Sequence, residues 1–238
     1  SLDGYNPEEK RAFVVYHNWV VNTPMETGVA DRAKALEALA TGQRFTNPFG
    51  IYVTGIDRDE TAGDNTGSFV TNKKIFYYIG AVMTLPTGVQ AIAENNYGRP
   101  DQALEYLNSM VRSFSYALPG SMYEVSPDYG MIVQAWNIFS FAVPIVEQFF
   151  GIYPDASENV IRLSPQMPSS WPEASLDRVR VLDGELSLDY SVHEGASEWE
   201  IDYTGNARLK VDVTKVPDAS VSVNGTMMEP QESVEGKF

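Results

Sequence analysis

The chain of 238 residues contains no cysteine and only two histidines, His17 and His193. Without cysteine it forms no disulfide, has no thiolate nucleophile and builds no cysteine-ligated metal site. Two histidines are too few for a multi-histidine metal centre. An acidic run in residues 57–64 offers oxygen ligands for Ca²⁺, but it lacks the spacing of an EF-hand, so a solvated loop is the simpler interpretation. We therefore expect neither a metal ion nor another cofactor.

Basic side chains are scarce as well. The sequence has 17 Lys and Arg against 32 Asp and Glu, which gives a formal net charge of −15. Because proteins that bind nucleic acid neutralise phosphates with clustered Lys and Arg, we expect no nucleic-acid partner. An uninterrupted run of the roughly 20 apolar residues that cross a bilayer is also missing. Residues 130–150 come nearest, but polar residues and Pro144 interrupt them, so we expect no membrane span.

Hydrophobic residues, at 43% of the chain, are numerous enough for a sizeable core. Up to about residue 151 their pattern is helical. Some segments are amphipathic, whereas others are apolar around most of the circumference and must be enclosed by neighbouring helices. The predicted helices span residues 7–21, 31–40, 72–95, 101–116 and 130–150, with Pro86 bending or breaking the third and Gly151 capping the last.

After Gly151 the pattern changes to short alternating segments separated by turn residues, which is typical of antiparallel strands. Asn224-Gly225 is a pair that favours a tight hairpin turn. We predict strands over residues 182–190, 198–203, 207–213 and 219–223. The expected organisation is a helical domain over residues 1–151, a linker rich in Pro and Ser over 152–181, and a β domain over 182–238.

Glu124 is the main candidate for catalysis. It lies beside Tyr123 in a loop that enters the most apolar predicted helix. A carboxylate that is partly removed from water at such a place has a raised pKa and suits acid–base chemistry. The simpler interpretation is a solvated loop residue, with Asp128 acting as an ordinary helix cap.

Other polar and aromatic residues also allow a functional and a structural interpretation. Gln134 on an apolar helix needs hydrogen-bond partners, and Trp136 either stacks on a sugar or fills the core. His17 and Trp19 flank Asn18 in a second polar and aromatic segment. That histidine suits either an active site or a hydrogen-bonded place in the core.

The segment 120–141 resembles a motif near the end of six-hairpin glycosidases. In the glycogen-debranching, amylo-α-1,6-glucosidase-like families, a loop Glu precedes a Gly-containing turn and a helix that reads Q-A-W-S. Here Glu124 and Gly130 precede Gln134-Ala135-Trp136, with Asn137 in the place of Ser. The motif therefore matches at the candidate carboxylate and at the helix that follows it.

Two upstream segments resemble the same families. Residues 47–57 resemble the loop T-P-x-G-I/L-R-T-L-S, although Tyr52 replaces its Arg. Residues 73–92 occupy the place of a helix that reads Q-G-T-V-W-P-W, but its Gln and both Trp are missing. Together with the first motif, the resemblance covers about residues 10–150.

The resemblance implies an α+β multidomain fold, in which part of an (α/α)6 barrel with about five to six helices precedes an antiparallel β-sandwich. A β-sandwich of this kind follows the barrel in α-L-rhamnosidase-like relatives. It also implies an inverting glycoside hydrolase with Glu124 as general base and a general acid roughly 6.5–9.5 Å away. The residues expected to contact the oligosaccharide or polysaccharide are Tyr123, Asp128, Gln134, Trp136 and Trp19.

The partner acid has only weak candidates, Glu26 and Asp57. We therefore expect a C-terminal portion of the enzyme that is inactive without the N-terminal half of the barrel, and we favour a periplasmic or secreted bacterial protein. One alternative is a polysaccharide lyase, which also joins an αα-toroid to a β domain and would use Tyr or His as base near an Asn, with His17 and Asn18 as candidates. The other is a non-catalytic carbohydrate-binding or structural module.

Overall fold

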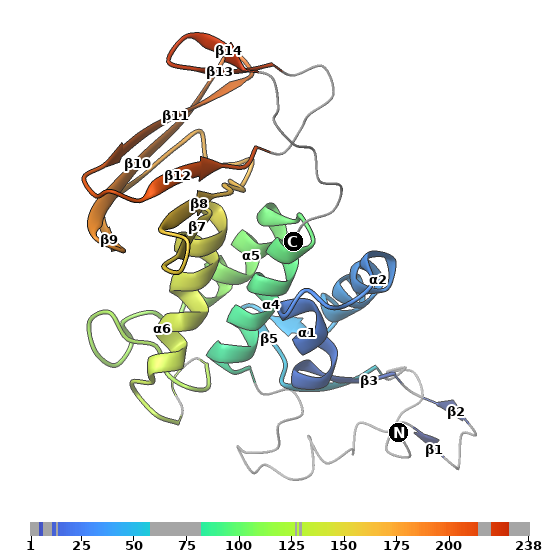
Figure 1. Cartoon of the computed structure of the whole chain (residues 1–238). Coiled ribbons are helices and arrows are strands. Elements are labelled where there is room, and N and C mark those ends of the chain that lie inside the picture. Colours follow the sequence, from blue (N-terminus) through green and yellow to red (C-terminus); the bar gives the residue numbers. More distant parts are fainter. Residues whose placement is uncertain are drawn as a thin grey trace. The chain divides into compact units, whose positions relative to one another are not determined.

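The computed structural model describes residues 5–6, 11–12, 14–57, 82–126, 128, 130–213 and 220–228. These residues form two units (Figure 1). The first contains the described residues up to Phe149 together with Gln166–Pro172, and the second contains Phe150–Pro165 and the described residues from Glu173 onward. The segment Gln166–Pro172 therefore returns to the first unit after two strands of the second.

Helices form most of the first unit. Asp31 begins one of them as an N-cap, because its side chain accepts a hydrogen bond from Lys34 N at 3.2 Å. No helix in the described part of the chain is both long enough and apolar enough to cross a membrane. The helices are α1 (Asn18–Glu26), α2 (Arg32–Gly42), α4 (Thr84–Asn96), α5 (Pro100–Val111) and α6 (Ala135–Ala142), which continues as the π-helix η3 (Val143–Phe149).

The helix predicted over residues 7–21 is wrong for the described residues up to His17 and correct from Asn18 onward. Strand β1 (Tyr5–Asn6) pairs with β2 (Arg11–Ala12), and β3 (Val14–His17) pairs antiparallel with β6 (Thr54–Asp57). Only at Asn18 does α1 begin. The run Val-Val-Tyr in β3 is β-branched and aromatic, so it favours a strand once a partner is available. That partner lies far along the chain, where local periodicity does not reveal it.

Helix α4 is the centre of the first unit. It packs against α1, α5 and α6, and 11 of its 13 residues are buried (Figure 1). The prediction that this segment is enclosed by other helices is therefore confirmed for the described residues. Pro86 lies in the first turn, where its missing N–H costs no hydrogen bond, so α4 begins just before Pro86 instead of bending there.

The backbones of α4 and α6 come very close at Gly88. A Cβ atom placed on Gly88 would lie 2.1 Å from the Cβ of Ser140 and 2.5 Å from its Cα. Ser140 is buried, and its hydroxyl donates to the carbonyl oxygen of Trp136 at 2.9 Å within the same helix. Only a glycine at position 88 allows this approach.

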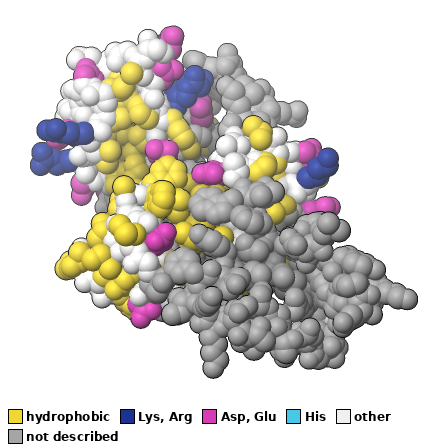
Figure 2. All heavy atoms as spheres, turned by 90° about the horizontal axis from the view of Figure 1, so that it is seen from below, with side chains coloured by type: hydrophobic (Ala, Val, Ile, Leu, Met, Phe, Trp, Pro, Cys, Tyr) yellow, Lys and Arg dark blue, Asp and Glu magenta, His cyan; other side chains and the backbone are white. Residues whose placement is uncertain are grey.

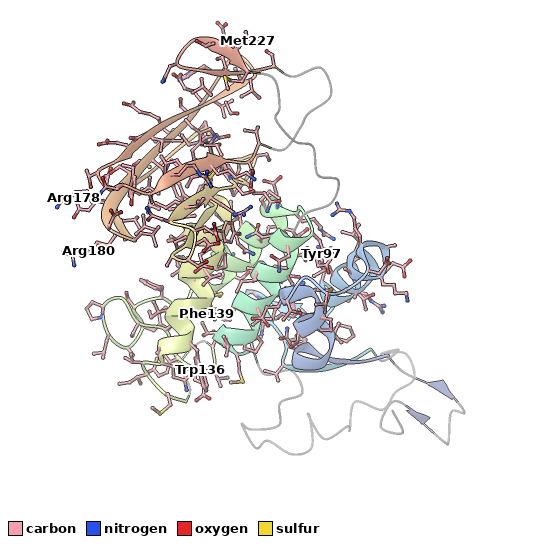
Figure 3. The ribbon with its side chains drawn as sticks, viewed as in Figure 1. Tyr97, Trp136, Phe139, Arg178, Arg180 and Met227 are labelled. Carbon is pink, nitrogen blue, oxygen red and sulfur yellow. The ribbon has the colours of Figure 1, made fainter. Side chains whose placement is uncertain are left out.

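Helix α6 was expected to be buried on all sides, and this expectation is wrong. Trp136, Ile138 and Phe139 are 49%, 47% and 44% exposed, whereas Asn137 and Ser140 are the buried residues of the helix. Figure 3 shows Trp136 and Phe139 on α6. The helix packs on α4 through one side only, so composition overstated its burial.

The second unit contains small β-sheets. The meander β9–β10–β11 is antiparallel, whereas β8 pairs antiparallel with β7 and parallel with β12. Asn224 and Gly225 have φ values of 49° and 75° between β13 and β14, which confirms the predicted hairpin turn. The strands are β7 (Ile152–Asp155), β8 (Val160–Leu163), β9 (Glu173–Val181), β10 (Gly184–His193), β11 (Ala196–Tyr203), β12 (Arg208–Val211), β13 (Val221–Val223) and β14 (Thr226–Met228).

The fold is α+β, but the expected (α/α)6 toroid portion followed by a β-sandwich is wrong. The described residues contain five α-helices without a ring of helical hairpins, and their sheets are separate, with two or three strands each. Two local features explain the difference. The N-terminal segment pairs as strands instead of lengthening α1, and residues 152–181, expected to be a linker, contain β7, β8 and β9.

Polar side chains of α4 are buried together with its apolar ones. Asn22 on α1 donates to the side chain of Gln90, and Gln90 Nε2 donates to Glu94 Oε1 at 3.0 Å. Glu94 Oε2 lies 3.1 Å from Arg99 Nε as an ion pair, without the geometry of a hydrogen bond. Burial raises the pKa of Glu94 to about 7, although Arg99 and the bond from Gln90 oppose the shift. This row of polar contacts fixes how α1 lies on α4.

Replacing Gly88 with alanine tests the close helix contact. We expect Gly88→Ala to lower the free energy of unfolding by about 1–3 kcal/mol, because the methyl group meets the backbone of Ser140. The measurement is urea unfolding followed by circular dichroism. Asn108→Ala, at an exposed position on α5, is the control and should change stability little. Equal stability of Gly88→Ala and the wild type would contradict the close contact between the backbones of α4 and α6 at Gly88.

Replacing Glu94 with glutamine tests the buried carboxyl group. The folded protein holds its proton up to about pH 7, whereas the unfolded chain releases it near 4.5. The contribution of the protonated Glu94 carboxyl group to the free energy of unfolding is therefore complete below pH 4.5. It is lost as the pH rises to about 7, by at most about 1.4 kcal/mol per pH unit. Glu94→Gln should remove this slope in urea unfolding, and exposed Glu37→Gln should retain it. If the free energy of unfolding of Glu94→Gln kept the same dependence on pH, the pKa of Glu94 would not be raised in the folded protein.

Candidate functional site

Glu124 lies in a loop that closes the N-terminal end of α4. The first helical N–H, that of Thr84, donates to the Glu124 carbonyl oxygen at 3.0 Å, and the Thr84 hydroxyl donates to the Tyr123 carbonyl oxygen at 2.6 Å. The residue before the helix, Met83, has no capping side chain, so these loop contacts satisfy groups that the helix leaves open. The backbone at Glu124 is therefore fixed to the central helix.

The side chain of Glu124 is held by the turn that follows it. Its Oε2 accepts a hydrogen bond from Met131 N at 3.3 Å, and its own N–H donates to the Met131 carbonyl oxygen at 2.9 Å. Gly130 has φ +81°, and a Cβ there would lie 2.8 Å from Glu124 Oε2. Glycine at this position thus permits both the turn and the place of the carboxylate.

Asn137 holds the same loop from α6. Its buried side-chain amide donates to the carbonyl oxygens of Met122 at 3.0 Å and Tyr123 at 3.3 Å. Together with Thr84, this places the loop between two helices. The positions of Tyr123 and Glu124 therefore depend on α4 and α6 and not on the loop alone.

The electrostatic surroundings of Glu124 leave its carboxylate available. The side chain is half-buried, and it forms no ion pair with any residue that the structure describes. A carboxylate that is fixed in place, reached by water and not neutralised by a cation is able to accept a proton from a bound water molecule.

Three other predicted contact residues lie near the start of α6. Gln134 is the N-cap residue, and its side-chain oxygen accepts a hydrogen bond from the indole N–H of Trp136. The Trp136 ring is about half exposed, and Tyr123 is half-buried in the loop that Asn137 holds. The structure thus brings these three residues to the same end of α6 as Glu124. Asp128 is exposed, and the side chain of Trp19 on α1 lies outside the described part.

No protein-family model and no curated protein matches this chain. The interpretation of the site therefore rests on its own geometry and on the resemblance of its motifs.

Of the two candidates for the partner acid, the structure describes the side chain of one, Glu26. Asn96 at the C-terminal end of α4 donates to the Glu26 carbonyl oxygen at 2.6 Å, whereas Glu124 binds the N-terminal end. A helix of 13 residues is about 20 Å long. Glu26, whose pKa is raised by burial, therefore lies at the wrong end of α4 to act opposite Glu124. The side chain of Asp57 lies outside the described residues.

The remaining sequence candidates do not form a second site among the described residues. Asn18 is fully buried, its N–H donates to the Val53 carbonyl oxygen at 2.8 Å, and its Nδ2 donates to that of Pro86 at 3.4 Å. The side chain of His17 and the acidic run after Asp57 lie outside the described part. Within the described part, no three His, Cys, Asp or Glu side chains are grouped to hold a metal ion.

Several large apolar side chains that precede and follow the Glu124 loop in the sequence are exposed. Figure 2 shows hydrophobic side chains gathered at the surface of the molecule seen from below. Monomeric proteins rarely leave large contiguous apolar patches in water, so such surfaces indicate binding. The exposed residues before and after the loop are Phe114, Tyr116, Leu118, Met131, Ile132, Val133, Trp136, Ile138 and Phe139.

Sequence reasoning gave no role to Thr84 and noted Asn137 only as a departure from the motif. Both residues hold the backbone of the Glu124 loop. A signal was available for Asn137, because it is a polar residue in an otherwise apolar helix and needs a buried hydrogen-bond partner. Thr84 carries no such signal, since its role arises only where the loop meets α4.

Removing the Asn137 amide tests the support of the loop. In Asn137→Ala the Met122 carbonyl oxygen loses its side-chain donor, and the Tyr123 carbonyl oxygen keeps only the Thr84 hydroxyl, so we expect the free energy of unfolding to fall by about 1–3 kcal/mol. Hydrogen exchange at Glu124 N–H should also become faster. Ile138→Ala, at a position 47% exposed, is the control and should leave that exchange unchanged. Equal protection of Glu124 in both variants would show that Asn137 does not support the loop.

Proposed function

We propose that this chain is the C-terminal portion of an inverting glycoside hydrolase that cleaves oligosaccharides or polysaccharides, with Glu124 as the general base. The observation that carries the proposal is the placement of the Glu124 carboxylate. It is half-buried, held by Met131 N and packed beside Gly130, where the motif of the debranching-like families has its loop Glu and glycine turn. The proposal concerns the site and its chemistry and does not require a toroidal fold.

In the proposed reaction Glu124 accepts a proton from a water molecule. As the proton leaves, the water oxygen attacks the anomeric carbon from the face opposite the leaving group. The bond to the leaving oxygen breaks, and that oxygen takes a proton from the general acid, so the configuration at the anomeric carbon is inverted. The contact with Met131 N orients the carboxylate while leaving its other oxygen for the water.

The aromatic residues near Glu124 support a carbohydrate substrate. The exposed indole of Trp136 is tethered to Gln134, and a flat apolar ring with a fixed orientation is suited to stack on the face of a sugar. Tyr123 and Gln134 would supply polar groups from the same end of α6. Trp19 and Asp128 are proposed as further contacts on the strength of the resemblance alone.

Of the two candidates for the general acid, the structure describes the side chain of Glu26 alone, and its position does not suit the role. Glu26 is at the far end of α4, well beyond the roughly 6.5–9.5 Å that separates the carboxyl groups of inverting enzymes. The exposed apolar side chains of α6 also support the presence of a further segment that packs on this helix, because large exposed apolar patches are normally covered. We therefore propose that a further part of the enzyme covers α6 and contributes the acid.

A polysaccharide lyase is the less favoured function. A lyase stabilises the negative charge that develops on the sugar carboxylate, for which its Asn must reach the substrate. Asn18 is fully buried, and its side-chain N–H groups point to the Pro86 carbonyl oxygen. A residue held in this way cannot contact a polysaccharide without rearrangement of α1.

Glu124→Gln in the full-length enzyme tests the proposal. Because glutamine cannot accept the proton from water, kcat should fall by about 10²–10⁴-fold, while KM changes little. Proton NMR of the wild-type reaction should show the product first in the inverted anomeric form. Added azide, which attacks without losing a proton, should partly restore cleavage by the variant.

Glu147→Gln is the matched control, since this exposed glutamate on η3 carries the same change outside the site. It should retain wild-type turnover. Near-normal turnover of Glu124→Gln, or a product with retained configuration, would refute the proposed role of Glu124. An unsaturated product absorbing in the ultraviolet would favour the lyase instead.

A further inference from the structure

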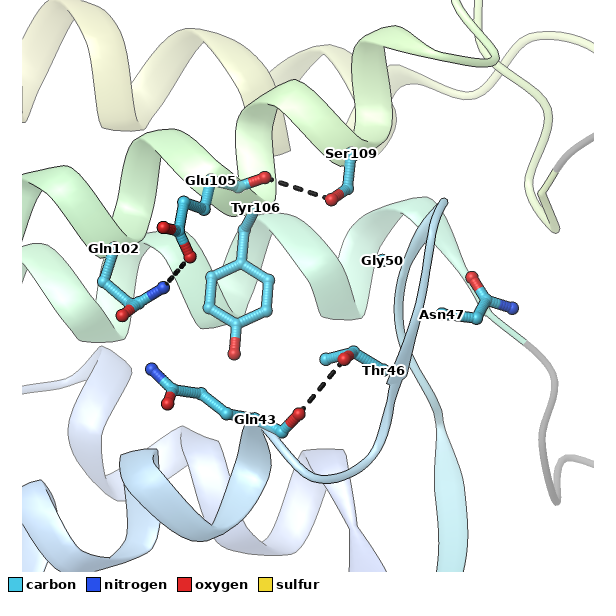
Figure 4. A pocket seen from close by; sticks show the side chains of 8 residues that line it. All are labelled: Gln43, Thr46, Asn47, Gly50, Gln102, Glu105, Tyr106 and Ser109. Atoms are coloured by element: carbon cyan, nitrogen blue, oxygen red, sulfur yellow. Dashed lines mark hydrogen bonds between the residues drawn. The ribbon is translucent and has the colours of Figure 1, made fainter. Parts of the chain in front are cut away.

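A polar pocket lies on the first unit, and the Glu124 site uses none of its residues. Its volume is about 250 Å³, and it is lined from α5, from the end of α2 and from β4 (Thr46–Asn47) and β5 (Gly50–Ile51). The residues that carry its chemistry are Gln43, Thr46, Gln102, Glu105, Tyr106 and Ser109 (Figure 4).

The walls of the pocket are preorganised by hydrogen bonds. Thr46 donates to the Gln43 carbonyl oxygen at 3.1 Å, and Ser109 donates to the Glu105 carbonyl oxygen at 3.0 Å. The side chain of Gln102 donates to Glu105 Oε2. Figure 4 shows the Tyr106 ring extending from α5 toward Gln43. Because Tyr106 is only 5% exposed, its ring is held in place by the surrounding residues.

The groups left for a ligand are both donors and acceptors. The carboxamide of Gln43 has no hydrogen-bond partner within the described part of the chain, so it offers N–H and C=O together. Glu105 Oε1 and the hydroxyl oxygens of Thr46 and Ser109 add acceptors. A ligand hydroxyl group donates and accepts at the same atom, which suits this mixture.

The charge and the volume of the pocket limit further which ligands it can bind. No Lys, Arg or His lines the pocket, and Glu105 makes it negative, so phosphate and carboxylate ligands are disfavoured. The volume lies just below the roughly 300–1,000 Å³ of sites for drug-sized molecules, which fits one small ring. We infer that this pocket binds a single neutral, hydroxyl-rich ring, such as one sugar unit, at a site separate from Glu124.

The experiment is a titration of the ¹⁵N-labelled chain with glucose, rhamnose and glucose 6-phosphate. The two neutral sugars should shift the side-chain amide signals of Gln43 and Gln102, and the anionic sugar should shift them less. Gln43→Ala should weaken the binding seen at Gln102 about fivefold to tenfold, because one donor and one acceptor are lost. Asn108→Ala, an exposed carboxamide on the same helix, should leave it unchanged.

One further result separates this inference from the proposed function. Glu124→Gln should bind the sugars at Gln102 as the wild type does, so failure of the hydrolase proposal would not affect the pocket. Absence of shifts at Gln43 and Gln102 with either neutral sugar would overturn the inference. Equal binding by Gln43→Ala and the wild type, or preference for glucose 6-phosphate, would overturn it as well.

Discussion

Burial of α4 along almost its whole length is the constraint on which the first unit depends. A helix enclosed on every side must have apolar residues that pack, polar residues that find partners and at least one place where a neighbour comes close. Gly88 allows the approach of α6, and the hydrogen bonds from Asn22 to Gln90 and from Gln90 to Glu94 connect α1 with the polar side chains of α4. The orientations of α1 and α6 follow from these contacts.

The two ends of α4 carry glutamates with different consequences. Glu94 is removed from water near the C-terminal end, so its carboxyl group titrates far above its ordinary range and contributes to stability. Glu124 meets the N-terminal end through its backbone, which leaves its side chain half in water. A buried carboxyl group with a shifted pKa makes the free energy of unfolding depend on pH, whereas the side chain of a half-exposed one is in contact with water. The geometry therefore gives Glu94 a structural role, whereas the role of Glu124 is the one that we propose.

Several predictions from the sequence were correct because they depend on local chemistry. Asp31 begins a helix, Gly151 follows one, and Asn224-Gly225 forms a tight turn, since each of these depends on residues that are neighbours in the chain. The N-terminal helix and the buried α6 were wrong, because both depend on distant partners. The candidate site shows the same division. Glu124, Gly130 and Gln134 were proposed from their motif, whereas the contact of Thr84 with the loop appeared only in the packing of the loop on α4.

The sequence by itself determined the absence of cysteine chemistry, the acidic charge and the change from helices to strands near residue 151. Tertiary structure alone decided that the described helices form no ring and that Glu26 and Glu124 stand at opposite ends of α4. It also decided that Gln43 and Tyr106 share a pocket. The physical reason is that turns and caps are set by adjacent residues, whereas distances between side chains are set by which helix faces pack together.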